Sequence, residues 1–511
     1  MFDVIIIGAG PGGLVCATNL AKSGYSVLVL EKNFFVGGTS YAFRRNGYTF
    51  PMGPLGFSSL PEVKTLLKNL AIEDQFTYTR NQYQLIAPDL NIIFSKPFEE
   101  LRAELISRYE SEEEGINHFF RAMENLANAI KHLYEWHPRY IFTKDGDFNH
   151  DDEAHRTAFE LIERSRRLPA KVFLDKEINN RTLYRFLGSL GTTEPKMSML
   201  LLGIMWALLS KDGIWYPSGG IHGILQALQQ HYIKFGGELQ LGTKVTNILV
   251  QEGRAIGVKT QKRDLMQAKW IVSNADYKST FLRLIDPNQI PNTFRSMIKD
   301  TSYFGSEFCV YLGIDPQKIE LSNISADHVF YRKALKLEEI SDVEDFENRE
   351  IEICFWSNKA PESAPPGKMT VLLRIAFPYD HFTKWKVSDL KRKEGYREYK
   401  IALANKLIKT VETLIPRLGS SIELMEVATP LTYEDFGQRF HGSIAGWSWA
   451  AEDIIKTSST LLLETPIENL LMCGLYASTE LFLGGVPTSL YTGYWAAEII
   501  KEKRKKIEKK N

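Results

Sequence analysis

A strand, a glycine-rich turn, a helix and a second strand follow one another at the start of the chain, and this order constrains the fold more than any other feature. Residues 3–7 form a β-branched run, which predicts a buried parallel strand. The turn GAGPGG at residues 8–13 leads into a helical pattern that Gly24 closes. Residues 26–30 predict the second strand, which ends at Glu31. The segment is therefore a βαβ unit with glycines in the GxGxxG positions.

Each part of this unit has a separate physical role. Gly8 allows the tight turn, Gly10 lets a pyrophosphate approach the backbone, and Gly13 lets the helix pack closely on the strand. The pyrophosphate would bind the unsatisfied N–H groups at the start of the helix. Glu31 follows at about the spacing expected for a carboxylate that binds ribose hydroxyls. We therefore expect a bound dinucleotide rather than a glycine turn without a ligand.

A second glycine pair separates two classes of dinucleotide-binding protein. Gly37-Gly38-Thr39-Ser40 lies shortly after the acid, and GYTF follows at residues 47–50. This pattern resembles flavoprotein oxidoreductases of the glutathione-reductase-like group, and the resemblance implies FAD rather than NAD. Members of that group usually carry Arg where this chain has Thr39, and often Asp where it has Pro51.

Two further blocks carry a more specific resemblance. The motifs YPSGG, GGEL, VTNI, GRAIGV and VSNAD occur in order between residues 216 and 276. The motifs TPLTY, GSIAGW, NLLMCG and GGVP follow between residues 429 and 487. The chain resembles the family of phytoene desaturases, carotenoid isomerases and retinol saturases.

The resemblance implies an α/β fold with a discontinuous, Rossmann-like FAD-binding domain of the glutathione-reductase type and an inserted α+β substrate domain. The FAD-binding domain would comprise residues 1–95, 213–284 and 425–511. The substrate-binding, partly helical domain would comprise residues 96–212 and 285–424. Residues 96–212 favour helices, whereas strands are expected at 308–313 and 369–377.

We expect FAD to bind noncovalently. The resemblance implies that Val245 contacts the adenine through its backbone, and that the helix beginning at Gly485 stabilises the reduced flavin through its dipole. Cys473 is interpreted as a small buried strand residue rather than a covalent flavin link. The expected cofactor-binding residues are Gly8, Ala9, Gly10, Pro11, Gly12, Gly13, Glu31, Lys32, Gly37, Gly38, Thr39, Ser40, Val245, Gly474, Gly485 and Val486.

No catalytic triad is recognisable. Glu480 and His441 are candidates for proton transfer because both lie beside segments expected near the flavin, but both also fit ordinary structural roles. A flavin accepts a hydride, and a polyene can lose its proton to a modest base or to water. Desaturation, saturation and isomerisation therefore all remain open at this point.

The resemblance implies an FAD-dependent oxidoreductase that acts on carbon–carbon double bonds of an apolar isoprenoid or polyene, as a carotenoid-like desaturase or cis–trans isomerase. Thr39, in place of the Arg of desaturases, favours isomerase-like or saturase-like relatives. The alternatives are a retinol-saturase-like reductase, an amine-oxidase-like flavoenzyme, and a prenyl-protein-binding module of the Rab-GDP-dissociation-inhibitor type. The intact glycine motif argues against the binding module.

Charge and apolar patterning limit the partners. Lys and Arg total 62, as do Asp and Glu, so there is no overall positive field to bind nucleic acid. Residues 197–209 are apolar but fall short of the roughly 20 needed to span a bilayer. They predict a buried core helix, or else a helix that dips into a membrane or lines an apolar tunnel. The basic residues 501–511 form either a solvated helix end or a contact with anionic lipid.

Cysteine and histidine spacing point away from a metal centre. Four Cys occur without a CxxC pair, and His150 and His155 lie too far apart for one metal-binding helix face. The N-terminus has no basic region of the secretory type. We therefore expect no metal and a cytoplasmic protein, with peripheral membrane contact as an open alternative; the oligomeric state is left open.

Overall fold

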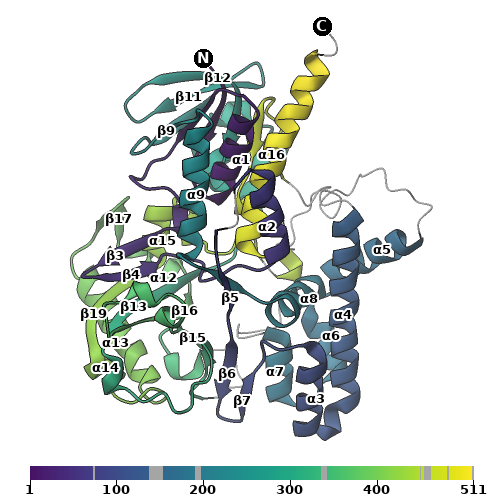
Figure 1. Ribbon diagram of the computed structural model, residues 1–511, viewed down its shortest axis with the longest axis vertical. Coiled ribbons are helices and arrows are strands. Elements are labelled where there is room, and N and C mark those ends of the chain that lie inside the picture. The colour runs from purple at the N-terminus through teal and green to yellow at the C-terminus, as the bar shows by residue number, and fades with distance from the viewer. Residues whose placement is uncertain are drawn as a thin grey trace.

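Two seven-stranded sheets and a helical lobe organise the fold, as Figure 1 shows. The computed structural model describes residues 1–72, 75–136, 153–189, 197–334, 342–448, 450–453, 462–479 and 483–508. The first sheet contains strands from three distant parts of the sequence. They are β1 (Phe2–Ile7), β2 (Val27–Leu30), β9 (Glu238–Gln240), β10 (Val245–Gln251), β11 (Arg254–Thr260), β12 (Leu265–Ser273) and β20 (Leu470–Met472).

Strand β1 lies at the centre of the parallel part of this sheet. Val4 is paired with Val27 of β2 and with Trp270 of β12, and both pairings are parallel. Strands β9 and β20 extend this part on either side. Strand β11 pairs antiparallel with the beginning of β12, and β10 pairs antiparallel with β11. The predicted strands and the βαβ unit are confirmed.

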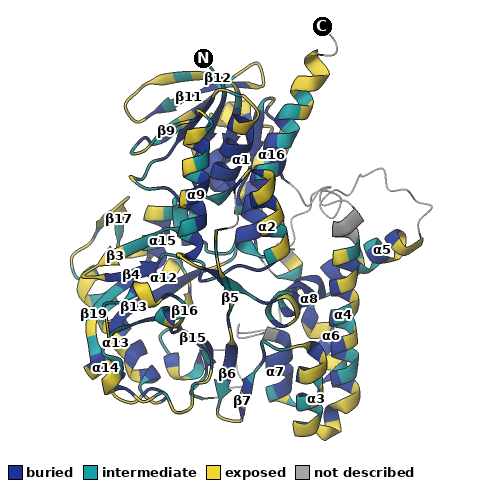
Figure 2. Cartoon of the chain, viewed as in Figure 1, coloured by how far each residue is buried: buried dark blue, intermediate teal, exposed yellow. Residues whose placement is uncertain are grey.

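Helix α1 (Pro11–Lys22) is covered on all sides, as the burial colours of Figure 2 show. It packs against α9 (Gly220–Lys234) and α16 (Gly485–Glu508), and α2 (Leu60–Asn69) lies beside α16. Two glycines allow the close approach of α1 and α16. A Cβ atom on Gly493 would lie 2.0 Å from the carbonyl oxygen of Gly12. Any larger residue at this contact would force the two helices apart.

The second sheet has the order β19-β13-β16-β15-β14-β6-β7, and only β14 and β6 pair in parallel. Alternate residues of β13 face opposite sides: Phe308 and Val310 pack toward α13, whereas Cys309 and Tyr311 face the other way. The predicted strands at 308–313 and 369–377 are confirmed. The bounds are β6 (Tyr83–Ala87), β7 (Leu90–Ile93), β13 (Ser306–Ile314), β14 (His328–Tyr331), β15 (Ile351–Cys354), β16 (Met369–Phe377), β19 (Ile422–Ala428) and α13 (Tyr396–Val411). Strands β6 and β7 belong to this sheet although they fall within residues 1–95.

The remaining strands and several short helices lie outside the two large sheets. Three two-stranded pairs are formed by β3 (Ala42–Arg45) with β4 (Tyr48–Pro51), β5 (Tyr78–Arg80) with β8 (Trp215–Pro217), and β17 (Lys386–Ser388) with β18 (Lys391–Arg392). The short helices are α10 (Tyr277–Ser279), α11 (Asn292–Asp300), α12 (Asp380–Thr383), α14 (Leu418–Ser421) and α15 (Pro430–Gly437).

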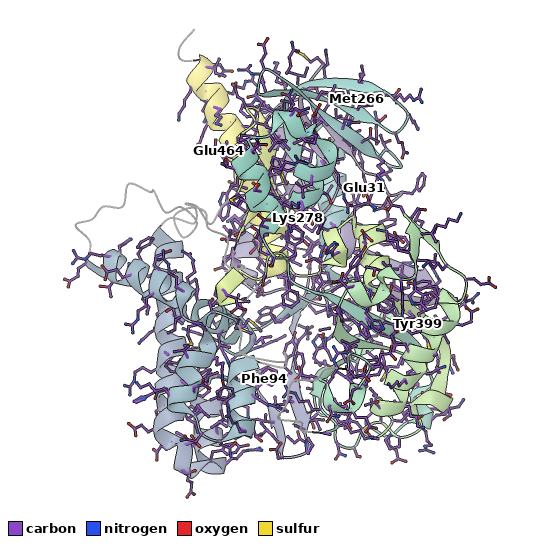
Figure 3. All side chains as sticks on the ribbon, turned by 180° about the vertical axis from the view of Figure 1, so that it is seen from behind. Glu31, Phe94, Met266, Lys278, Tyr399 and Glu464 are labelled. Carbon is purple, nitrogen blue, oxygen red and sulfur yellow. The ribbon has the colours of Figure 1, made fainter. Side chains whose placement is uncertain are left out.

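The helical lobe packs around Trp206, whose ring contacts those of Phe119 and Phe120. Phe94 lies where this lobe meets the second sheet (Figure 3). The helices are α3 (Phe98–Arg108), α4 (Glu113–Trp136), α5 (Glu153–Arg167), α6 (Ala170–Glu177), α7 (Arg181–Ser189) and α8 (Met199–Trp206). Helix α8 is buried and continues as a π-helix over Ala207–Asp212, which confirms the prediction of a core helix. No helix in the described residues is both long and apolar enough to cross a bilayer.

Candidate active site

A cavity of about 410 Å³ opens where the carboxyl ends of β1 and β12 meet. This is the edge at which open α/β sheets bind their ligands. Segments that are far apart in the sequence line it. The expected cofactor-binding residues that line it are Gly8, Gly10, Pro11, Glu31, Lys32, Gly37, Gly38, Thr39, Val245 and Gly474.

The glycine turn forms one wall of this cofactor cavity. Gly8 has a φ of +95°, a conformation that residues with a side chain rarely adopt. A Cβ atom on Gly13 would lie 2.1 Å from the carbonyl oxygen of Gly8, so the helix can approach the turn only with glycine there. Gly10 precedes α1 and provides no side-chain cap. The first turn of α1 is therefore a suitable binding site for an anionic group.

The carboxylate of Glu31 is fixed at the end of β2. Its Oε2 accepts a hydrogen bond from the N–H of Ala9 at 2.8 Å, and its Oε1 accepts one from the N–H of Asn33 at 2.9 Å. Burial raises the pKa of Glu31, and these two backbone hydrogen bonds oppose the rise. Each carboxylate oxygen keeps acceptor capacity, so the group can also bind a hydroxyl.

Asn274 joins the two glycine-containing turns and was not singled out from the sequence. Its N–H donates to the carbonyl of Ile7 at 2.9 Å, and its Nδ2 donates to the carbonyl of Gly8 at 3.4 Å. On the other side, a Cβ atom on Gly474 would lie 2.4 Å from Asn274 Oδ1. The VSNAD motif contains Asn274, so the signal for it was present in the sequence.

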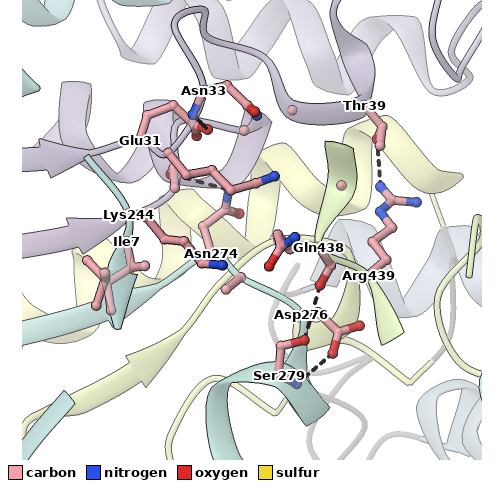
Figure 4. Close-up of a pocket in the computed structure, with 18 of the residues that line it drawn as sticks. Ile7, Glu31, Asn33, Thr39, Lys244, Asn274, Asp276, Ser279, Gln438 and Arg439 are labelled. Atoms are coloured by element: carbon pink, nitrogen blue, oxygen red, sulfur yellow. Dashed lines mark hydrogen bonds between the residues drawn. The ribbon is translucent and has the colours of Figure 1, made fainter. Parts of the chain in front are cut away.

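Four cationic residues line the cavity, namely Lys32, Lys244, Arg283 and Arg439, and Figure 4 shows Arg439. Lys32 donates from Nζ to the carbonyls of Asp435 and Phe436, at 3.0 and 2.8 Å, and burial lowers its pKa to about 8. Arg439 donates from Nη2 to Thr39 Oγ1 at 2.7 Å. No sequence motif predicted a role for Arg439. It follows Gln438, whose left-handed backbone conformation ends α15.

The other expected cofactor residues lie behind the cavity wall or beside it. Ala9 acts through its N–H on Glu31, and Gly12 and Gly13 lie within α1. Ser40 lines a neighbouring cavity. Gly485 and Val486 begin α16, whose Ser489 reaches the cofactor cavity one turn later.

Of the two catalytic candidates, the structure describes His441 but not Glu480. The ring of His441 stacks on those of Tyr379 and Phe440, at centroid distances of 4.6 and 4.1 Å, and His441 lines neither cavity. Glu480 lies outside the described residues, as does His150. Cys473 is buried and lines neither cavity.

A second cavity of about 1000 Å³ adjoins the first, and Thr39, Phe436 and Gly437 line both. Its wall is rich in aromatic rings, whereas charged residues occupy its exposed edge, where Arg45 and Glu426 form an ion pair at 3.3 Å. The aromatic residues are Phe35, Tyr41, Phe43, Tyr216, Tyr311, Trp356, Tyr433 and Phe436. The cavity is large enough for an extended molecule, and its aromatic side suits apolar groups.

The observed donors and acceptors fit FAD. The first turn of α1 can hold a pyrophosphate, Glu31 can accept hydroxyl hydrogen bonds from a ribose, and the glycines leave room for close backbone contact. Within the described ranges, no three His, Cys, Asp or Glu side chains gather as ligands for a metal ion.

Comparisons with known proteins agree with this geometry. Prolycopene isomerase from Daucus carota is 28% identical over 470 residues, which are 86% of this chain and 71% of that protein. The 4,4'-diapophytoene desaturase of Methylomonas sp. is 24% identical and covers 98% of this chain and 96% of its own length. An all-trans-retinol 13,14-reductase from Danio rerio is 26% identical and covers 92% of this chain and 82% of its own length. The resemblance predicted from the sequence motifs is confirmed.

Solved structures show the same fold. Wild-type putrescine oxidase bound to putrescine is 16% identical and has a TM-score of 0.62, with 98% of this chain and 99% of that chain covered. An oxidoreductase from Methanosarcina mazei is 15% identical and has a TM-score of 0.61, with 96% and 99% covered. The predicted fold class is confirmed.

The match to one protein family extends over almost the whole chain. Residues 11–501 match the family described as flavin containing amine oxidoreductase. The match begins within the glycine turn and includes the VSNAD strand and α16, so it contains most of the cavity lining; Ile7, Gly8 and Gly10 lie just before it. The chain therefore belongs to the flavin containing amine oxidoreductase family and is an FAD-dependent oxidoreductase.

Proposed function

We propose that the protein forms, reduces or isomerises a carbon–carbon double bond of an apolar isoprenoid or polyene, as a carotenoid-like desaturase or cis–trans isomerase. The observation that carries the proposal is the large aromatic cavity that shares a wall with the cofactor cavity. An extended apolar molecule in that cavity can present its carbon atoms to the shared wall. The names of the relatives, a prolycopene isomerase, a diapophytoene desaturase and a retinol reductase, support the same substrate class.

In this proposal FAD would occupy the cofactor cavity. The first turn of α1 would hold the pyrophosphate, Glu31 would bind a ribose, and Val245 would contact the adenine through its backbone. Gly474 and the beginning of α16 would contact the flavin end. FAD supplies hydride transfer at this site. The protein's own contribution is to bind the substrate, to exclude water from it and to move a proton.

The domain division remains a proposal. Residues 1–95, 213–284 and 425–511 would bind FAD, and residues 96–212 and 285–424 would bind the substrate, with β6 and β7 contributing to the substrate-side sheet. An apolar substrate would reach the cavity from a lipid surface, with the protein cytoplasmic and peripheral. The basic end of α16 is partly neutralised by ion pairs such as Lys503–Glu464 at 2.6 Å. Flotation with anionic vesicles tests this contact.

Anaerobic incubation distinguishes the reactions. The holoenzyme is mixed with prolycopene, all-trans-retinol or putrescine, first oxidised and then prereduced, and the products are analysed by mass and retention. A polyene product with two fewer hydrogens indicates desaturation, one with two more indicates saturation, and an unchanged mass with altered retention indicates isomerisation. Turnover of putrescine alone would overturn the proposal in favour of an amine oxidase, and no change in any polyene would overturn it outright.

A further inference from the structure

A buried ionic cluster lies beneath the aromatic cavity. Arg374 donates to Glu307 Oε2 from Nη2 at 2.7 Å, and its Nη1 lies 3.2 Å from Glu352 Oε2. The side chains of Glu307, Arg374 and Glu352 are only 5%, 17% and 23% exposed. None of these residues takes part in the cofactor cavity.

The strand register places the cluster on the cavity side of the second sheet. Arg374 of β16 is paired with Cys309 of β13 and with Glu352 of β15. Side chains alternate along each strand, so Glu307 shares a face with Cys309 and with Tyr311, which lines the aromatic cavity. The three ionic side chains therefore face the substrate side rather than the core under α13.

Burying three charged groups is costly, and apolar residues of similar size would pack there at no such cost. Buried ionic groups next to a cavity are therefore candidates for function. One residue connects this cluster to the cavity. Tyr433 lines the aromatic cavity, and its hydroxyl donates to Glu307 Oε1 at 2.5 Å.

Tyr433 also lies close to the cofactor side. It belongs to α15, one turn before Phe436 and Gly437, the two residues of that helix that line both cavities. Burial and the neighbouring Glu307 raise the pKa of Tyr433 well above its usual value, so the phenol keeps its proton at neutral pH. A proton can therefore pass through the hydroxyl while the oxygen remains uncharged.

We propose that Tyr433 is the group that takes the proton from the substrate in this cavity, with Glu307 as the final acceptor and Arg374 and Glu352 as positioning residues. The assignment rests on the proposed function. A substrate C–H bond breaks, an O–H bond forms on Tyr433, and the proton that Tyr433 held passes to Glu307 Oε1. The electron pair of the broken C–H bond becomes the second bond between the two carbon atoms. The adjacent carbon gives up a hydride, and the flavin-dependent activity supplies the acceptor for that hydride. The reverse sequence returns a proton to carbon.

Two substitutions test the relay against a merely structural role. Tyr433→Phe removes only the hydroxyl, and Glu307→Gln keeps an acceptor for that hydroxyl but cannot take a proton. Tyr48→Phe is the matched control, because the Tyr48 hydroxyl also donates to a glutamate, Glu423 Oε2 at 2.9 Å, but Tyr48 lines neither cavity. The probe is whichever polyene, prolycopene or all-trans-retinol, the wild-type holoenzyme converts. FAD content, binding of the probe by flavin difference spectra, single-turnover rate and the solvent deuterium isotope effect are measured.

We expect both Tyr433→Phe and Glu307→Gln to keep FAD and to bind the probe within about threefold of wild type, while the single-turnover rate falls by about 10²–10⁴-fold. The solvent isotope effect should also change, whereas Tyr48→Phe should keep the wild-type rate and isotope effect. A variant rate within about threefold of wild type for Glu307→Gln or for FAD-loaded Tyr433→Phe overturns the relay. If the wild type converts neither probe, the proposed function fails first, and the relay fails with it.

Discussion

Arg439 donates a hydrogen bond from Nη2 to Thr39 Oγ1 at 2.7 Å, although the two residues are 400 positions apart in the sequence. Thr39 occupies the position after the second glycine pair, where the flavoproteins that this chain resembles usually carry arginine. The chain after α15 thus places the guanidinium of Arg439 beside Thr39, the residue that stands where those flavoproteins carry arginine. Arg439 also donates to the carbonyl of Ile444 at 2.7 Å, which fixes the neighbouring loop.

The first prediction concerns Arg439→Met. The substitution removes charge-assisted hydrogen bonds that hold two parts of the cofactor cavity together, each worth about 1.5–3 kcal/mol. We expect the Kd for FAD to rise about 10–100-fold, as measured by flavin fluorescence during titration of the apoprotein. Arg417→Met, which removes an exposed ion pair with Glu320, is the control. Equal FAD affinity in Arg439→Met and wild type would contradict this role.

Gly13→Ala tests the packing of the glycine turn. Its Cβ would lie 2.1 Å from a backbone oxygen that cannot move away cheaply, so the free energy of unfolding should fall by about 1–3 kcal/mol, and FAD should bind more weakly. Gly305→Ala is a matched control, because nothing lies within 4 Å of a Cβ at that position. Thermal unfolding of both variants gives the comparison, and a normal melting temperature for Gly13→Ala would refute the packing argument.

His328 makes stability depend on pH. Burial lowers its pKa from 6.5 to about 3, and its Nε2 lies 2.7 Å from the sulfur of Cys354. Between these two pH values the unfolded chain binds a proton that the folded chain does not, so stability is lost as the pH falls below 6.5. From pH 6.5 to 5 the loss should be about 2 kcal/mol.

The measurement is the free energy of unfolding in urea at several pH values, for wild type and His328→Gln. The variant should lose less stability than the wild type between pH 6.5 and 5. Parallel pH profiles would show that His328 does not contribute to acid sensitivity.

Noncovalent binding of FAD is testable through Cys473. The thiol is buried, and burial raises its pKa well above the usual value, so it is a poor nucleophile. Acid precipitation of the holoenzyme should release the flavin into the supernatant, and Cys473→Ala should retain bound FAD before precipitation. A flavin that stays in the wild-type pellet but leaves the variant's would indicate a covalent link.

Local features were predictable because they depend on residues close together in the sequence. The positive φ of Gly8 and the close approach at Gly13 can be met only by glycine, so the βαβ unit is visible in the sequence itself. The strand of VSNAD was also predicted, but the role of Asn274 depends on its distance from two turns.

Long-range features were not predictable. The pairing of β6 with β14 and the contact of Arg439 with Thr39 form only when distant segments fold together, and neither leaves a motif. The cluster of Glu307, Arg374 and Glu352 is equally hidden, because each residue alone looks like a charged strand residue. Only the register of three strands brings the three together on one face.

The central claim is that the aromatic cavity holds an apolar polyene against the cofactor cavity. Titration of the oxidised holoenzyme with prolycopene under anaerobic conditions tests it most directly, by difference absorbance of the flavin. The account predicts a saturable change in the flavin spectrum for wild type. A weaker change is expected for Ala42→Trp, whose indole occupies part of the aromatic cavity but leaves the cofactor cavity intact. An unchanged spectrum in the wild type, or the same response in Ala42→Trp, would contradict the account.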